Sequence, residues 1–79
     1  MNKYQKAALK YASISKDWRI RWHSYADDKT TTNAIRGLHD AGLVITNNCN
    51  QYKITPLGMS QDQITIKEYH RIVYPRNQF

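Results

Sequence analysis

The sequence has little of what marks a disulfide-stapled, membrane-spanning or multidomain protein. Cys49 is its only cysteine, so a framework of disulfides within the chain is excluded. The longest purely apolar run is Leu43 to Ile45, which is far too short to cross a bilayer. Three glycines, two prolines and no repeated or low-complexity tract leave no stretch with the composition of a linker. The 79 residues therefore predict one small domain over 1–79.

Acidic residues are also few. Lys and Arg total 12 against 6 Asp and Glu, which gives a formal net charge of +6 and a pI near 9.7. A domain this basic suits a polyanion, with nucleic acid as the first candidate and an anionic membrane as the second. The segment MNKYQKAALK lacks the apolar centre of a signal peptide. We therefore expect a cytoplasmic protein.

Motifs of catalysis and metal binding are missing as well. The sequence has no glycine-rich phosphate loop, no HExxH and no pair of cysteines. His23, His39 and His70 do not stand at the spacing of metal ligands, and no histidine is placed next to Cys49 to activate its thiol. We expect neither an enzyme nor a resident metal or cofactor, and no small-molecule ligand is evident.

The segment from Lys3 to Ala12 predicts a helix, because it has no helix breakers and is rich in good helix formers. At 100° per residue its apolar residues form one stripe and its lysines lie opposite, which predicts a basic outer face that is solvated in the simplest case. The stripe comprises Tyr4, Ala8, Leu9 and Ala12, with Tyr11 at its edge, and the basic face comprises Lys3, Lys6 and Lys10.

The stretch from Ser13 to Tyr25 fits two periods. Large apolar residues alternate with basic ones, as in a strand, while three aromatic residues also stand at helical spacing. The alternating residues are Trp18, Ile20 and Trp22 against Arg19, Arg21 and His23, and the aromatic residues are Trp18, Trp22 and Tyr25. Because Trp, Ile and Tyr favour strands, we predict a strand with both tryptophans in the core and the arginines outward.

The clearest helix signal lies between Asp27 and Gly42. Asp27-Asp28 is a turn signal, Thr30 is the expected N-cap, and Gly42 supplies the left-handed residue that often closes a helix. The pattern predicts a helix over 31–41. Its inward face comprises Thr31, Ala34, Ile35, Leu38 and Ala41.

A hairpin is predicted next. The runs 43–46 and 51–55 favour strands, the polar residues 47–50 form the turn between them, and Pro56 ends the second strand. With the helices before it, this hairpin places the core in residues 3–58.

The extension over 59–79 carries one local signature. Thr65 and Glu68 match a capping box, and Ile64 and Tyr69 occupy the positions of a hydrophobic staple. They predict a short helix over 66–74, stopped by Pro75. Its apolar side comprises Ile66, Tyr69 and Val73, and a strand through Ile64 and Ile66 is the alternative.

This order of elements resembles the winged helix-turn-helix family over about Tyr4 to Gly58. The resemblance is most specific in AIRGLHDAGLV at 34–44 and YKITPLG at 52–58. The resemblance implies an α+β fold of three short helices with a small antiparallel β-hairpin as the wing. Within the family, the pattern is similar to that of small bacterial and bacteriophage members. The second helix of that family is not evident, and the stretch from Trp18 to Tyr25 stands in its place.

The outward face of the 31–41 helix suits DNA. Eleven residues span about 16 Å, and a major groove about 12 Å wide admits such a helix. Asn33 can pair with adenine and Arg36 with guanine. Free N–H groups at the helix start suit a phosphate there. The outward face comprises Lys29, Thr32, Asn33, Arg36 and Asp40, and the phosphate group comprises Lys29, Thr30 and Thr31.

Two further groups extend the predicted interface. The turn and second strand of the wing offer Asn47, Asn48, Asn50, Gln51 and Lys53, although asparagines equally serve tight turns. Basic residues of the 18–25 stretch suit phosphates, or simply cover the edge of the core with their stems. The full predicted set is Arg19, Arg21, Lys29, Thr30, Thr31, Thr32, Asn33, Arg36, Asn48 and Lys53. Removing the charge of Lys10 is expected to weaken all duplexes alike.

These observations predict sequence-specific binding of double-stranded DNA by a small transcriptional regulator or accessory DNA-binding factor, in a bacterium or a phage-infected host cell. A homodimer through the 66–74 helix is possible, and no membrane partner is expected. The alternative is a winged-helix module that binds and inhibits a host or partner protein through Trp18, Trp22 and Tyr25.

Overall fold

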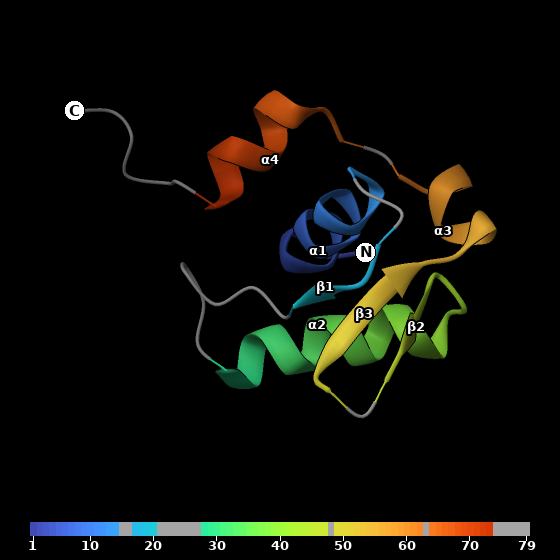
Figure 1. The fold of residues 1–79 in the computed structure, drawn as a ribbon. Coiled ribbons are helices and arrows are strands. Elements are labelled where there is room, and N and C mark those ends of the chain that lie inside the picture. Colours follow the sequence, from blue (N-terminus) through green and yellow to red (C-terminus); the bar gives the residue numbers. More distant parts are fainter. Residues whose placement is uncertain (15–16, 21–27, 48, 63, 74–79) are drawn as a thin grey trace.

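The computed structural model describes residues 1–14, 17–20, 28–47, 49–62 and 64–73, and these form an α+β domain (Figure 1). The described chain has four helices and a three-stranded antiparallel sheet. In chain order they are α1 (Lys3–Ser13), β1 (Arg19–Ile20), α2 (Asp28–Asp40), β2 (Val44–Thr46), β3 (Gln51–Ile54), α3 (Pro56–Ser60) and α4 (Ile66–Val73). No helix of the described chain combines the length and the apolar character that crossing a bilayer requires.

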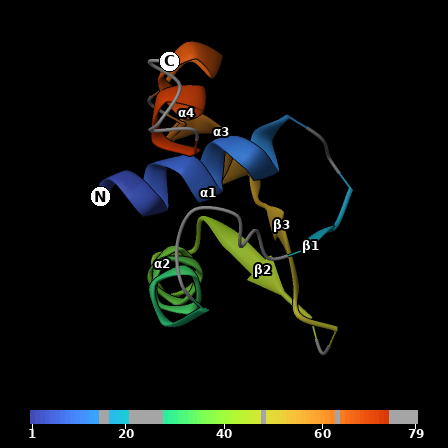
Figure 2. The ribbon, with the colours of Figure 1, turned by 90° about the vertical axis from the view of Figure 1, so that its left-hand side faces the viewer.

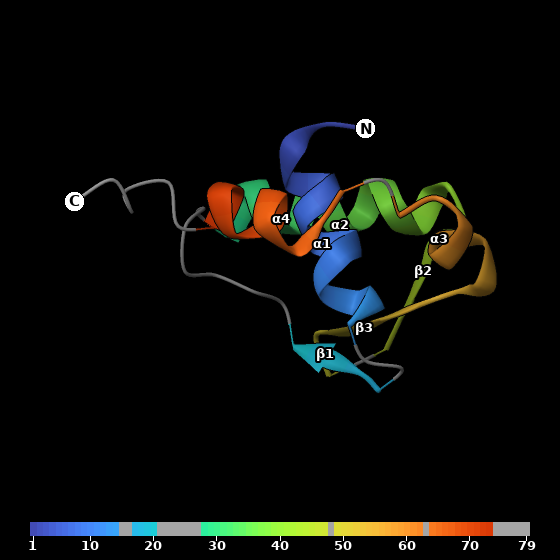
Figure 3. The same ribbon diagram turned by 90° about the horizontal axis from the view of Figure 1, so that it is seen from above.

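The sheet has the strand order β1-β3-β2, so the second strand of the predicted hairpin lies in the middle. Tyr52 of β3 pairs with Thr46 on one side and with Arg19 on the other. Its ring is buried, and its hydroxyl donates to the carbonyl oxygen of Ala8 at 3.0 Å. Seen from above, β1 and the adjoining part of β3 lie along one edge of the molecule (Figure 3). One face of the sheet therefore packs on α1.

Helix α1 lies in the middle of the molecule, between α2 and α4 (Figure 2). Ala7, Ala8 and Ala12 are fully buried, and such small side chains let neighbouring elements approach α1 closely. The predicted solvated face of lysines is wrong in part, because Asp62, in the segment between α3 and α4, pairs with Lys10. The Nζ atom of Lys10 lies 2.9 Å from Oδ2 of Asp62, and both side chains are largely shielded from solvent.

Helix α2 begins at Asp28, three residues before the predicted start, so Thr30 lies inside the helix and is not its N-cap. Four of the five predicted inward residues are buried: Thr31, Ala34, Ile35 and Leu38. Ala41 is exposed because the helix has already ended at Asp40. Gly42, with φ of 77°, closes the helix as predicted.

The two segments that carry the family resemblance meet at one corner of the fold. The Thr55 hydroxyl donates to the Gly42 carbonyl at 2.7 Å and accepts from the Gly58 N–H at 3.0 Å. A Cβ atom on Gly58 would lie 2.1 Å from the carbonyl oxygen of Leu43, so only glycine fits there. The sequence analysis missed α3, which starts at this corner. Thr55 as N-cap followed by Pro56 is its start signal.

Helix α4 starts with the predicted capping box. The Thr65 N–H donates to Oε1 of Glu68 at 3.0 Å, and the Glu68 N–H donates to the Thr65 hydroxyl at 3.1 Å. Val73 belongs to the hydrophobic core, so the core extends beyond residue 58, where the sequence analysis ended it. Ile66 is exposed rather than inward, because Ile64 occupies the buried position before the helix. The apolar side of α4 thus packs on α1, and a homodimer through this helix stays a prediction.

Strand β1 reverses the predicted orientation of its side chains. Trp18 is 39% exposed and Ile20 is 58% exposed, whereas Arg19 is partly buried. The Arg19 guanidinium lies 4.4 Å from the centre of the Tyr11 ring, and its Nε donates to the Tyr11 carbonyl at 3.1 Å. The end of α1 offers an aromatic face and a backbone carbonyl at this edge, and a cation interacts with both better than an indole does. Arg21, Trp22, His23 and Tyr25 lie outside the described residues.

Candidate nucleic-acid interface

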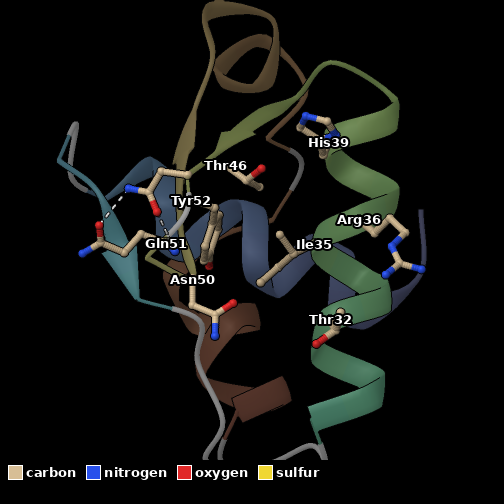
Figure 4. Close-up of a pocket in the computed structure, with 9 residues that line it drawn as sticks. Thr32, Ile35, Arg36, His39, Thr46, Asn50, Gln51 and Tyr52 are labelled. Carbon is tan, nitrogen blue, oxygen red and sulfur yellow. Dashed lines mark hydrogen bonds between the residues drawn. The ribbon is translucent and has the colours of Figure 1, made fainter.

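A groove of about 270 Å³ lies between α2 and the β2–β3 hairpin, and we call it the hairpin groove (Figure 4). Its two sides come from elements that the sequence analysis assigned to the recognition helix and the wing. The lining residues are Thr32, Ile35, Arg36 and His39 of α2 together with Thr46, Asn47, Asn50, Gln51 and Tyr52 of the hairpin.

The α2 side of the hairpin groove presents Thr32, Arg36 and His39. They follow one another at four and three residues, so they share one face of the helix. Arg36 and His39 are exposed, while Ile35 beneath them is buried against the core. Ile35 and the buried Tyr52 form an apolar floor that fixes the distance between the helix and the hairpin. The polar groups of the groove therefore lie beside two residues of the hydrophobic core.

The hairpin side is organised by Asn47. Its Oδ1 accepts from the backbone N–H groups of Cys49 at 2.8 Å and Gln51 at 3.2 Å, and its Nδ2 donates to Oε1 of Gln51 at 2.9 Å. The amide of Asn47 is thus used to build the turn, which is the structural alternative that the sequence left open. Asn50 has a φ of 61° and an exposed side chain on the groove. Asn48 lies outside the described residues.

The hairpin groove is polar but carries little charge. None of its nine lining residues, all within the described ranges, is a carboxylate, and Arg36 is the one permanent cation among them. Asp28 and Asp40 offset Lys29 and Arg36 on α2, and the Nδ1 atom of His39 lies 3.7 Å from Oδ1 of Asp40. The net charge of +6 is therefore not concentrated on α2.

The predicted DNA contacts of α2 divide into those that are accessible and those that are not. Lys29, Asn33 and Arg36 are exposed. Thr31 is 0% exposed, so its side chain cannot reach a ligand. The phosphate site was predicted at the start of this helix. The helix starts earlier than predicted, and Asp28 occupies its first turn. A carboxylate at this position already supplies the negative charge that the helix dipole favours.

The predicted contacts outside α2 are only partly available. Arg19 is engaged with Tyr11, as described above. The Nζ atom of Lys53 lies 5.8 Å from the centre of the Trp18 ring, and the side chain is partly exposed. Arg21 belongs to the residues that the structure does not describe. Of the phosphate-binding group predicted from Arg19, Arg21 and His23, the structure describes Arg19 alone, and its guanidinium already has partners.

His39 is the lining residue that the sequence analysis missed as a DNA contact. It was considered only as a metal ligand, although it follows Arg36 by three residues on the same helix face. Cys49 is exposed. The described residues contain no group of three or more His, Cys, Asp or Glu side chains that would hold a metal ion.

Comparisons of the chain with known proteins found no match. No family model matches the chain, and no curated protein or solved structure does.

Proposed function

We propose that this chain is a winged helix-turn-helix protein that binds double-stranded DNA in a sequence-specific manner, as a small transcriptional regulator or an accessory DNA-binding factor. The observation that carries the proposal is the position of Arg36. It stands exposed on α2 where this helix lines the hairpin groove, and no carboxylate belongs to the lining. Arginine in that position pairs with guanine through two parallel hydrogen bonds.

The arrangement of elements supports the same function. Helix α2 has 13 residues and so a length of about 20 Å, enough to lie in a major groove about 12 Å wide. Asn33 is exposed three residues before Arg36 and can pair with adenine. The hairpin that follows α2 in the chain lies beside it, as a wing lies beside a recognition helix.

Because the charges of α2 are balanced, we assign this helix to recognition of the base sequence more than to attraction of the phosphates. Phosphate contacts supply sequence-independent affinity, and base contacts supply specificity. With its own four charges offset, α2 contributes chiefly through the hydrogen bonds of Asn33, Arg36 and His39. Among the described residues, Lys53 on the hairpin and Lys29 on α2 offer cations for phosphate contacts.

Selection of bound duplexes from a random pool, followed by titration at several salt concentrations, tests the proposal. Arg36→Ala should lower the preference for the selected sequence by about 10- to 100-fold, because a bidentate pair discriminates by about 1–3 kcal/mol. The matched control is Lys67→Ala, which removes an exposed cation of α4 and should leave the preference unchanged. Equal behaviour of the two variants, or affinity that ignores salt, would reject duplex reading.

A second candidate function rests on the exposed face of the sheet. Trp18, Ile20 and Ile45 are all exposed, and Ile45 pairs with Lys53 on the face turned away from Tyr52. Exposed tryptophan is typical of the surfaces that bind proteins. The comparison of wild type with Trp18→Phe isolates the Trp18 emission. Emission that is freely quenched, together with absence of duplex binding, would favour a protein-interaction module.

A further inference from the structure

A second groove, of about 310 Å³, lies between α1 and α4, and we call it the amino-terminal groove. It is lined by Lys3, Tyr4 and Lys6 of α1, by Glu68, Arg71 and Ile72 of α4, and by Ile64. Helices α2 and α4 lie on opposite sides of α1 (Figure 2), so this groove and the hairpin groove are formed on different sides of that helix. A ligand in one groove leaves the other open.

The amino-terminal groove carries an excess of positive charge. Lys3, Lys6 and Arg71 make no ion pair with any residue that the structure describes. Glu68 is the one carboxylate of the lining, and its Oε1 already accepts the Thr65 N–H at 3.0 Å. That backbone hydrogen bond, with the nearby charges of Arg71 and Lys6, lowers the pKa of Glu68. Three cations thus face one carboxylate that is committed to the helix cap.

The floor of the amino-terminal groove is apolar and recessed. Ile64 is 9% exposed, and Tyr4 and Ile72 are partly buried against the hydrophobic core. A recessed floor accepts an incoming apolar side chain, but it cannot itself insert into a bilayer, which requires protruding apolar residues. The phosphates of a duplex bring no apolar group to such a floor. The combination therefore favours a peptide over both a membrane and a nucleic acid.

We propose that the amino-terminal groove binds an acidic peptide segment of a partner protein, with carboxylates facing Lys6 and Arg71 and an apolar side chain on the floor of Ile64, Tyr4 and Ile72. Cations at the rim give charge complementarity and a faster encounter, and the apolar pocket holds the bound side chain. This interaction is independent of the proposed DNA contact, since none of its residues lines the hairpin groove.

Fluorescence anisotropy with the full chain and labelled 12-residue peptides tests this. The probe carries four Glu residues around a Leu-Phe pair. One control peptide replaces Leu-Phe by Ser-Ser, and a second replaces Glu by Gln. We expect binding of the probe to exceed that of either control by about tenfold, because both the charges and the apolar pair contribute.

The matched protein variants are Lys6→Glu/Arg71→Glu and, as control, Lys67→Glu/Lys29→Glu. Both reverse two exposed or partly exposed cations, but only the first pair lines the amino-terminal groove. The groove pair should weaken probe binding by about tenfold or more, and the control pair by about twofold, through screened long-range charge alone. Lys6→Gln/Arg71→Gln repeats the measurement if the reversed charges disturb the fold.

Three results would overturn the proposal. The first is equal binding of the Ser-Ser peptide, which would leave the apolar floor without a role. The second is a loss of duplex binding by Lys6→Glu/Arg71→Glu as large as the loss of peptide binding, which would make the groove part of a nucleic-acid surface. The third is binding to phosphatidylserine vesicles without binding to the probe. Failure of duplex binding by wild type rejects the proposed function and leaves this proposal standing.

Discussion

The two grooves of this domain differ in the kind of group that they present. The hairpin groove offers amide, hydroxyl and imidazole groups with one permanent cation, whereas the amino-terminal groove offers three cations and one carboxylate around an apolar floor. Hydrogen-bonding groups in fixed positions distinguish one partner sequence from another, and a cluster of like charges attracts any oppositely charged partner. In this chain the larger cluster of cations and the exposed polar face of α2 therefore lie on different surfaces.

The grooves also differ in how they are built. The hairpin groove stands on Ile35 and Tyr52, which belong to the hydrophobic core. The amino-terminal groove depends on the docking of α4 against α1. Variants that disturb the hairpin corner should therefore affect the whole fold, and variants under α4 should have smaller effects.

Gly58→Ala should have the largest effect on stability. The added Cβ would lie 2.1 Å from the Leu43 carbonyl oxygen, a backbone atom, and 2.7 Å from Cγ1 of Ile54. Overpacking against backbone should cost about 3 kcal/mol or more of the free energy of unfolding. Gly37→Ala is the matched control. Its Cβ would meet only the end of the Gln5 side chain, which can move, and alanine favours helix by about 1 kcal/mol. Urea denaturation of both variants checks the difference, and equal losses would contradict it.

Lys10→Met comes next and tests the ion pair between α1 and Asp62. It leaves Asp62, whose Oδ1 is already buried without a hydrogen-bond partner in the described chain, with no counter-ion. We expect a loss of about 1–3 kcal/mol. Lys6→Met, on the same helix, should stay within about 0.5 kcal/mol. The sequence analysis expected the charge of Lys10 to support duplex binding. Because Lys10 pairs with Asp62, we now expect its removal to lower stability instead. If duplex affinity falls while the unfolding free energy does not, the revised prediction is wrong.

Tyr52→Phe should have a smaller effect on the hairpin side. It removes the hydrogen bond from the buried hydroxyl to the Ala8 carbonyl, which joins the middle strand to α1, and should cost about 1 kcal/mol. Tyr11→Phe is the control, because no hydrogen bond of that hydroxyl exists within the described residues. Thermal unfolding followed by circular dichroism measures both. A loss of stability in Tyr11→Phe but not in Tyr52→Phe would mean that the Tyr52 hydrogen bond does not stabilise the hairpin.

The smallest effect concerns the pH dependence of α4. The Thr65 backbone N–H, with lesser help from Arg71 and Lys6, lowers the pKa of Glu68 below its usual value. A carboxyl whose pKa is lower in the folded state stabilises the fold above the unfolded pKa and loses this contribution as the pH falls through the folded one. Glu68→Gln should therefore flatten the decline in stability below about pH 4.3. Asp40→Asn is the exposed control. If the stability of Glu68→Gln declined at low pH as steeply as that of wild type, the expected contribution of Glu68 would be wrong.

Local signals in the sequence predicted much of the fold. The capping box at Thr65, the closing residue Gly42 and the hairpin around Asn47 are each fixed by neighbours a few residues away, and the structure confirms them. The inward face of α2 followed from helical spacing alone. Of the site, the exposed positions of Asn33 and Arg36 were predicted in this way, and the structure agrees.

The failures share a cause in contacts that are distant along the chain. Trp18 was expected inside because apolar and basic residues alternate in its stretch, but Tyr11 and the end of α1 favour Arg19 at that position. The lysines of α1 looked solvated because nothing in the helix itself indicates that Asp62, 52 residues after Lys10, lies beside it. The amino-terminal groove combines α1 and α4 in the same way, so no local pattern could reveal it.

The burial of Val73 in the common core bears on how short the chain can become. A fragment that stops at residue 58, where the sequence analysis ended the core, would uncover the side of α1 that α4 protects. The smallest autonomous unit should therefore run at least to residue 73, and shorter fragments should aggregate or unfold.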